Sequence, residues 1–481
     1  MATKKTRVES DLIGSREIPE EALYGVQTLR GIENFPISKF KVSDYPLFIK
    51  GLAITKKGAA IANHELGLLN EEISKAIQQA CDEIIAGQHH EHFPVDMIQG
   101  GAGTTTNMNG NEVIANRALE IMGHKRGEYD YCSPNDHVNR SQSTNDAYPT
   151  AIHLGLYFTH LKLVDHLKKL VDSLEKKAVE FKDVIKMGRT QLQDAVPMTL
   201  GRTFHGFANI LAHEIDNLNF AAEEFLTVNM GSTAIGTGIC SEPGYSEKCV
   251  AALSKITGWD IKLADDLVGA TSDTSCMVGY SQAMKRVAVK INKIADDLRL
   301  LSSGPRCGLG EINLPAMQPG SSIMPGKVNP VIAEVANQVA YKVIGNDVCV
   351  TMCGQGAQME LNAMEPVMAQ CCFESADLLM NGFDTLRTRC IDGITANAEH
   401  CKKQVLNSIG IITALNPIIG YKNSTVIAKE AAATGKSVYD LVLEHDILDK
   451  KDLDTILAPE NMIKPVKFDI KPKKHLQTQL E

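Results

Sequence analysis

The sequence predicts an all-α protein whose core is a bundle of five long helices, and three observations carry that prediction. Of its 481 residues 44% are hydrophobic but only 5% are aromatic, a composition that suits close-packed helices better than an aromatic-rich β-sandwich or barrel. Between residues 151 and 394 five long stretches read as helices, separated by short polar, glycine-rich segments. One of these stretches carries an uninterrupted heptad pattern, which is typical of helices that pack lengthwise against one another.

That pattern predicts the clearest helix, over residues 274–303. Its apolar side chains alternate in steps of three and four, as the a and d positions of a heptad do. They are Met277, Tyr280, Met284, Val287, Ile291, Ile294, Leu298 and Leu301. At 1.5 Å per residue such a helix is roughly 45 Å long.

In chain order we expect three domains: a mixed helical domain over residues 1–142, the long-helix domain over 143–397 and a small helical domain over 398–481. The long helices are predicted over residues 151–182, 201–230, 274–303, 331–353 and 363–394. The fourth is apolar or small nearly all round, which is typical of a helix buried at the centre of a bundle. Because helices of this length cannot cover all their apolar faces within one chain, we expect a symmetric homo-oligomer.

Composition excludes several classes of partner and location. The 49 Lys and Arg against 58 Asp and Glu give a charge of −9, whereas nucleic acids and acidic membranes call for a basic surface. No run approaches the ~18 apolar residues of a membrane helix, and the first residues carry no apolar signal-peptide core. The 12 cysteines form no C-x-x-C motif and are too sparse for a disulfide scaffold. We therefore expect a cytoplasmic protein that binds neither nucleic acid nor membrane.

Four polar stretches between the helices are candidates for chemistry, since they offer hydroxyls and amides but few carboxylates. They cover residues 100–109, 141–146, 188–194 and 320–330. In the last stretch Asn329 and Pro330 read as the N-cap and first residue of a helix. Residues 320–329 would then lead into the positive end of a helix dipole beside Lys327, a suitable place for a small anion such as a carboxylate.

The string GSSIMPGKVNP (residues 320–330) closely resembles the signature of the fumarase/aspartase superfamily. Residues 9–38, 101–120 and 141–151 are similar to its aspartate ammonia-lyase branch, and the resemblance covers essentially the whole chain. It implies an all-α chain of three domains that forms a homotetramer with a twenty-helix core and active sites where three subunits meet. It also implies a small-molecule substrate, L-aspartate or fumarate, and no required cofactor, while activation by a divalent cation stays open.

The family reaction is a β-elimination through an aci-carboxylate carbanion, and the resemblance assigns roles position by position. Ser321 matches the base that removes the C3 proton. The other matched positions are Ser322, Thr104, Ser143 and Thr144 for the β-carboxylate, Thr190, Lys327 and Asn329 for the α-carboxylate, and Asn145 for the amino group. The residues alone would not single out a serine as base, since no neighbouring histidine is visible to activate it.

Gln191 departs from the pattern of many superfamily members, which carry histidine in the GRT-x-LQDA stretch. Ammonia can leave as a neutral molecule without a general acid, so we expect Gln191 to orient the α-carboxylate without titrating. Fumarate hydratase is the alternative function on the same fold. A catalytically silent structural homologue, or a member acting on argininosuccinate or adenylosuccinate, is a more remote one.

Several further residues are interpreted as structural. His89, His90 and His92 lie in one loop without evident further ligands, so no metal site is predicted. Cys276 is expected to fill space in the core. Asp146 is expected to cap a helix or join an ion pair.

Overall fold

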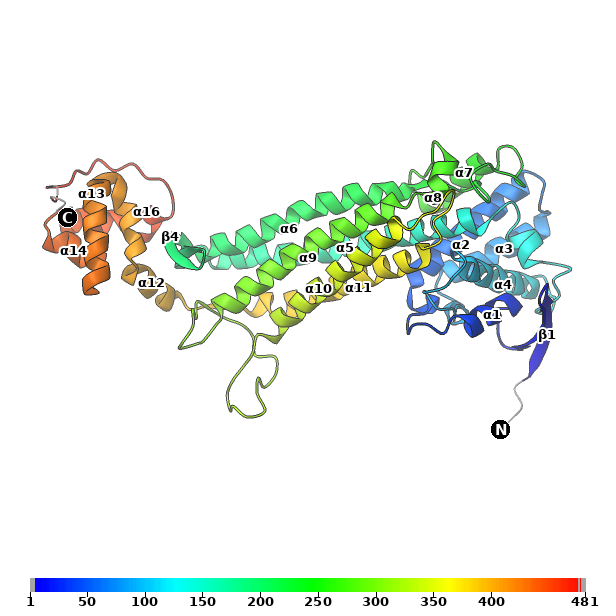
Figure 1. The fold of residues 1–481 in the computed structure, drawn as a ribbon, viewed down its shortest axis with the longest axis horizontal. Coiled ribbons are helices and arrows are strands. Elements are labelled where there is room, and N and C mark those ends of the chain that lie inside the picture. The colour runs from blue at the N-terminus through cyan, green and yellow to red at the C-terminus, as the bar shows by residue number, and fades with distance from the viewer. Residues whose placement is uncertain (1–4, 475, 477–481) are drawn as a thin grey trace. The chain divides into compact units, whose positions relative to one another are not determined.

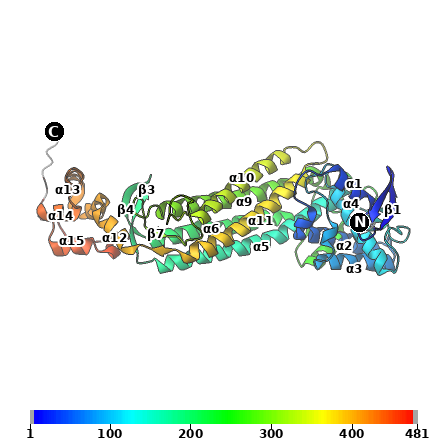
Figure 2. The ribbon, with the colours of Figure 1, turned by 90° about the horizontal axis from the view of Figure 1, so that it is seen from below.

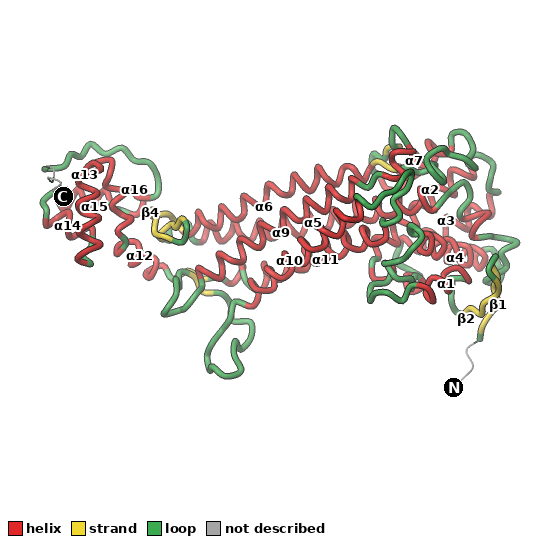
Figure 3. The backbone as a smooth tube through the Cα atoms, viewed as in Figure 1, coloured by secondary structure: helices red, strands yellow, loops and turns green. Residues whose placement is uncertain are grey.

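The computed structural model describes residues 5–474 and 476, and most of them are helical, with only short strands (Figure 3). The chain divides into two compact units. The first unit comprises residues 1–165, 214–289 and 339–381, and the second comprises 166–213, 290–338 and 382–481. Five long helices, all labelled in Figure 1, have residues in both units: α5 (Thr144–Glu180), α6 (Leu200–Glu223), α9 (Ser275–Leu301), α10 (Val331–Gly354) and α11 (Glu365–Arg389). The prediction of an all-α chain with five long helices is confirmed, whereas the domain limits at residues 142 and 397 stay a prediction.

The heptad pattern of α9 is buried as predicted. Each of its eight apolar positions from Met277 to Leu301 is at most 8% exposed. A period of 3.5 residues keeps these side chains on one stripe. Figure 2 shows α9 running lengthwise beside the other long helices.

Helix α5 starts seven residues before its predicted start, and Pro149 lies inside it. A proline lacks the N–H that would bond the carbonyl four residues earlier. The side-chain amide of Asn229 donates to that carbonyl, of Asn145, at 3.0 Å. A side chain from another segment thus replaces the lost hydrogen bond and lets the helix continue through the proline.

Helix α10 differs from its prediction. Tyr341, Val348 and Met352 follow one another at helical spacing, and their exposed fractions are 58%, 54% and 62%. An apolar composition all round a helix predicts that the helix is buried, but it does not tell whether the same chain or another molecule covers it. Within one chain this face of α10 is uncovered.

The rest of the first unit is a helical layer with two short sheets. Its elements are β1 (Thr6–Asp11), β2 (Gly14–Pro19), α1 (Val26–Asn34), η1 (Val42–Asp44), α2 (Pro46–Glu65), α3 (Glu71–Ile85), η2 (His90–His92), α4 (Thr104–Ile121), η3 (Pro134–Val138), η4 (Glu224–Leu226), β5 (Thr227–Val228), α7 (Tyr245–Thr257), β6 (Lys262–Leu263) and α8 (Leu267–Ser272). Strands β1 and β2 form an antiparallel hairpin, and β5 and β6 pair in parallel. The buried carboxylate of Glu112, on α4, accepts from the backbone N–H groups of Gln27 and Thr28 at 2.8 and 3.0 Å. These N–H groups belong to the first turn of α1 and have no partner within the helix, so Glu112 fixes α1 against α4.

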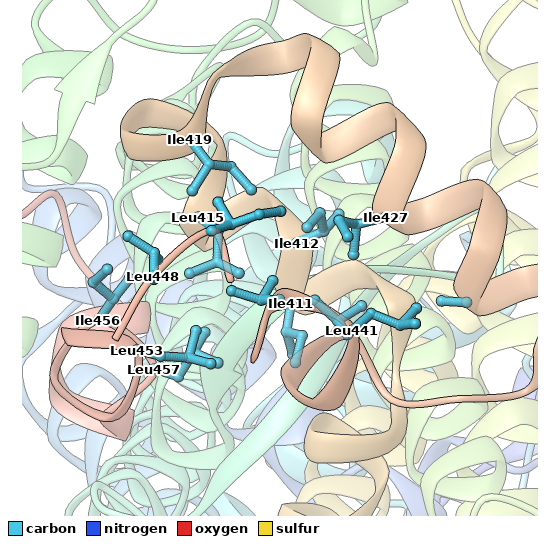
Figure 4. Close-up of a cluster of buried hydrophobic side chains, with 14 of the residues drawn as sticks. Ile411, Ile412, Leu415, Ile419, Ile427, Leu441, Leu448, Leu453, Ile456 and Leu457 are labelled. Carbon is cyan, nitrogen blue, oxygen red and sulfur yellow. The ribbon is translucent and has the colours of Figure 1, made fainter. Parts of the chain in front are cut away.

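The rest of the second unit holds the small C-terminal helices. Its elements are β3 (Ile185–Thr190), β4 (Gln193–Thr199), β7 (Ile312–Asn313), η5 (Ile391–Gly393), β8 (Thr395–Ala396), α12 (Ala398–Asn407), η6 (Ile409–Ile411), α13 (Ile412–Thr434), α14 (Val438–Glu444), α15 (Lys450–Ile456) and α16 (Pro459–Met462). Strands β3 and β4 form an antiparallel hairpin, and β7 pairs with β8. The short helices converge on one buried aliphatic cluster, in which Leu415, Leu441 and Leu453 are fully covered (Figure 4). Among the described residues, none of the helices combines the length and the apolar character that crossing a membrane requires.

Candidate active site

Four of the predicted substrate-binding residues lie at the N-termini of two helices in the first unit. Thr104 is the first residue of α4 and follows Gly103, whose φ of 86° is left-handed and favours glycine. Ser143 caps α5: its hydroxyl accepts from the N–H of Asn145 at 3.2 Å, and its own N–H donates to the carboxylate of Asp146 at 3.0 Å. This reciprocal arrangement is a capping box, in which Asp146 has the capping role predicted for it. Thr144 and Asn145 are the first two residues of α5.

The two helix ends are joined by side chains. The amide of Asn107, in the first turns of α4, donates to the hydroxyl of Thr144 at 3.2 Å. The amide of Asn145 donates to the carbonyl of Ala234 at 2.8 Å and so fixes the start of α5 to the loop after Val228. Helix N-termini carry partial positive charge and exposed N–H groups, so two of them bearing hydroxyls suit a carboxylate.

Asp146 also joins the start of α5 to the loop after Val228. It is fully buried, and its second oxygen accepts from the N–H groups of Gly231 and Thr233 at 3.1 and 3.0 Å. Burial raises the pKa of Asp146 to about 7.

Lys56 is a polar residue of this region that the sequence interpretation missed. It is fully buried in α2, and its ammonium donates to the amide oxygens of Asn107, Asn139 and Gln142 at 2.6, 3.1 and 2.8 Å. Burial lowers the pKa of Lys56 to about 7. One sequence signal could have found it: Lys56 stands four residues after Leu52 and three before Ala59, on a buried face of the helix.

The other six predicted residues belong to the second unit. Thr190 and Gln191 were expected in a loop but lie at the tip of the β3–β4 hairpin, where Thr190 pairs with Gln193. The two turn residues, Gln191 and Leu192, have φ of 56° and 61°. Such a turn normally takes Asn-Gly, because other side chains are strained at positive φ. Strained backbone of this kind concentrates at functional sites, which favours a role for the exposed Gln191.

The signature loop in the second unit is closed at its base. The N–H of Gly320 donates to the carbonyl of Lys327 at 2.8 Å, and the amide of Asn329 donates to the carbonyl of Gly320. The prediction that Asn329 caps α10 is therefore wrong. The helix begins at Val331, and the carbonyl of Pro330 accepts its first hydrogen bond, from the N–H of Glu334 at 3.0 Å. The side chain of Asn329 is engaged with the loop.

Within this loop Ser321 accepts hydrogen bonds from the backbone N–H groups two and three residues further on, as the helix-capping Ser133 also does. Its hydroxyl oxygen accepts from the N–H groups of Ile323 and Met324 at 3.2 and 2.9 Å. Ser322 and Lys327 are exposed. In the described part of the chain no hydrogen bond joins the hairpin tip to this loop.

In the histidine loop the carboxylate of Glu91 lies near two of the histidines, and the sequence analysis did not name it as a possible metal ligand. One ligand atom from each of His89, Glu91 and His92 lies within 4.8 Å of the others. Both imidazoles already have hydrogen-bond partners, however. His89 pairs with Glu83 at 2.9 Å, and His92 lies 3.4 Å from the backbone N–H of Leu23.

Cys276 is buried as expected and has a polar neighbour. Its sulfur lies 3.1 Å from Nε2 of His153, whose Nδ1 lies 3.0 Å from the carbonyl of Thr227. Burial raises the pKa of the Cys276 thiol and lowers the pKa of His153 to about 4, so both are neutral near pH 7.

Comparison with known proteins extends over the whole chain. The profile of the family described as Lyase matches residues 14–345, and the profile described as Fumarase C C-terminus matches residues 411–464. The aspartate ammonia-lyase of Pseudomonas aeruginosa is 56% identical over 461 residues, covering 96% of this chain and 97% of its own. That of Helicobacter pylori is 54% identical over 469 residues, covering 98% and 99%.

Solved structures agree with these relatives. The chain superimposes on a fumarate lyase:delta crystallin from Brucella melitensis, bound to cobalt, with a TM-score of 0.93 at 49% identity, over 96% of this chain and 100% of that one. A class II fumarase from Schistosoma mansoni gives a TM-score of 0.89 at 33% identity, over 95% and 99%. By sequence and by fold, the chain belongs to the aspartate ammonia-lyase family of the fumarase/aspartase superfamily.

Proposed function

We propose that the protein catalyses the reversible elimination of ammonia from L-aspartate to give fumarate. The observation that carries this proposal is the hydrogen bonding of Ser321 within the family signature loop. A serine hydroxyl is a weak base, but two N–H groups that already point at its oxygen stabilise the deprotonated form. Ser321 then removes the C3 proton of L-aspartate, and the electron pair moves into the β-carboxylate to form the aci-carboxylate.

The group that gains negative charge in this step is the β-carboxylate. In the proposal Thr104, Ser143, Thr144 and Ser322 hold it by their hydroxyls. Thr104 gives up its hydrogen bond to the carbonyl of Gly101, at 2.7 Å, to do so. The N-termini of α4 and α5 add two positive dipole ends beside the first three. Because the charge on this carboxylate rises toward the intermediate, these contacts are stronger in the transition state than in the substrate complex, which is what accelerates a reaction.

The α-carboxylate carries a constant charge and needs mainly to be held. Lys327 supplies the cation, while Thr190 and Asn329 donate hydrogen bonds; one amide hydrogen of Asn329 is used on Gly320, and the second is left for the substrate. Gln191 orients the same carboxylate, and Asn145 contacts the amino group. The amino group is bound as ammonium and departs as neutral ammonia, so no protonating histidine is required at position 191.

We further propose a homotetramer in which the active site forms between copies. The uncovered apolar face of α10 supports self-association, since a stripe of Tyr341, Val348 and Met352 would otherwise stay in water. The family resemblance implies that the site is completed by loops from three copies. Light scattering of the purified protein tests this: a monomer active on L-aspartate would refute it.

The alternative function is that of fumarate hydratase, and the similarity of the fold to a class II fumarase is the observation that supports it. Fumarate release followed by ultraviolet absorbance, from L-aspartate and separately from L-malate, decides between the two. We expect L-aspartate to be the faster substrate by a wide margin. A faster reaction with L-malate would transfer the assignment to fumarate hydratase, and no reaction with either would indicate a silent homologue or a larger substrate.

No cofactor has a role in the proposed steps, and a cytoplasmic location fits cysteines kept as thiols. Activity on L-aspartate should therefore persist after dialysis against EDTA. If Mg²⁺ or Mn²⁺ raises the rate of the dialysed enzyme, activation by a divalent cation is established as well.

A further inference from the structure

The buried ammonium of Lys56 has an unusual set of partners. All three of its N–H groups are directed at neutral amide oxygens, those of Asn107, Asn139 and Gln142, and none at a carboxylate. Burial disfavours the charged form of Lys56, and the nearby carboxylate of Asp146, which favours that form, accepts no hydrogen bond from it. An apolar side chain would avoid the cost of burying the ammonium. A lysine here therefore calls for an explanation beyond stability.

An ammonium differs from every neutral polar group in that it can only donate. Each of the three amides is consequently fixed with its oxygen toward Lys56 and its NH₂ group pointing away. A serine or glutamine in place of Lys56 could accept as well as donate, and would leave the orientation of the amides undecided.

The orientation of Asn107 is the one that reaches the candidate site. With its oxygen 2.6 Å from Lys56, its NH₂ group donates to the hydroxyl oxygen of Thr144 and to the amide oxygen of Asn139, both at 3.2 Å. Thr144 thereby serves as an acceptor for Asn107, and its own hydrogen is left for another acceptor. If the side-chain amide of Asn107 were rotated by 180°, its oxygen would face Thr144 and accept the hydroxyl hydrogen of Thr144. That hydrogen would then not be available to another acceptor.

We infer that Lys56 is a positioning residue for the elimination: through Asn107 it keeps the hydrogen of Thr144 directed at the substrate carboxylate. This inference rests on the proposed function, in which Thr144 donates to the β-carboxylate. Lys56 itself does not touch the substrate.

A double-mutant cycle tests it. Lys56→Met removes the ammonium while keeping most of the side-chain volume, Thr144→Val removes the hydroxyl, and the third variant combines both. Lys57→Met is the matched control, because the adjacent Lys57 pairs with Asp82 at 2.5 Å rather than with the amides. For each protein kcat and KM for L-aspartate, the Kd of succinate and the unfolding temperature are measured.

If Lys56 acts through Thr144, each single variant should lose at least tenfold in kcat with a smaller change in KM. The combined variant should then be no more than about threefold worse than the poorer single variant, since residues acting as one unit are not additive. Lys57→Met should keep the parent kcat. Losses that multiply in the combined variant, or a Lys56→Met enzyme with parent kcat, would overturn the inference.

Two precautions keep the test decisive. If Lys56→Met does not fold, the variant Asn107→Asp takes its place. The carboxylate of this variant still accepts a hydrogen bond from Lys56, but it has no N–H group to donate to Thr144. We therefore expect kcat to fall while the fold is kept. Parent-like kcat in Asn107→Asp would refute the inference. If the parent itself does not deaminate L-aspartate, the proposed function fails, and the same cycle is judged on the Kd of succinate.

Discussion

Ser321→Ala is the perturbation that tests the proposed chemistry most directly. It deletes one hydroxyl from a half-exposed loop and leaves the backbone free to keep its conformation. A positioned general base contributes about 10²–10⁴ in rate. At 1.36 kcal/mol per factor of ten this corresponds to a barrier about 2.7–5.4 kcal/mol higher.

The same substitution should barely change stability. The hydroxyl of Ser321 accepts hydrogen bonds from the backbone N–H groups of Ile323 and Met324. These two residues are 84% and 48% exposed, so water can replace the hydroxyl as the acceptor. A surface change of this kind stays within about 0.5 kcal/mol. The loss should therefore appear in kcat for L-aspartate while the unfolding temperature and the oligomer size stay as in the parent.

Ser322→Ala is the matched control, because the neighbouring Ser322 lies in the same loop and carries the same hydroxyl. In the proposal it only helps to hold the β-carboxylate, so its loss should cost less in kcat than that of Ser321. A Ser321→Ala enzyme within tenfold of the parent rate, or a Ser322→Ala enzyme that is the more impaired, would show that Ser321 is not the base.

Three further perturbations probe the rest of the site and the fold. Lys327→Ala removes the fixed positive charge for the α-carboxylate, so the KM for L-aspartate should rise about tenfold or more; an unchanged KM would remove Lys327 from the site. Gln191→His should reduce deamination only modestly and should not confer L-malate dehydration, because no general acid is needed for ammonia, and a gain of dehydration would contradict this. Arg117 lowers the pKa of Glu83 to about 2, so their pairing stabilises the fold above pH 4.5 and is lost as the pH falls toward 2. Glu83→Gln should accordingly unfold at a lower temperature than the parent at pH 7, the gap closing between about pH 4.5 and 2, and a gap independent of pH would refute the linkage.

The local parts of the fold could be predicted from the sequence. The α9 helix was found within two residues of its ends, because a heptad pattern is written in neighbouring residues and needs no partner to be recognised. The signature loop was found by resemblance, and it carried the assignment of Ser321 that chemistry alone would not have made.

Only the tertiary structure decided what surrounds these residues. Helical periodicity places Lys56 on a buried face of α2, but its three amide partners stand 51, 83 and 86 positions away in the sequence, so no local pattern could identify them. The strained turn of Gln191 depends on strand pairing across the β3–β4 hairpin. Asn329 read as a helix cap because that is its local preference, and it bonds Gly320 instead because the folded loop brings that carbonyl within reach. Periodicity and composition thus determined the helices, whereas the surroundings of Lys56, Thr144 and Asn145 were determined by hydrogen bonds between residues distant in the sequence, which form only when the chain is folded.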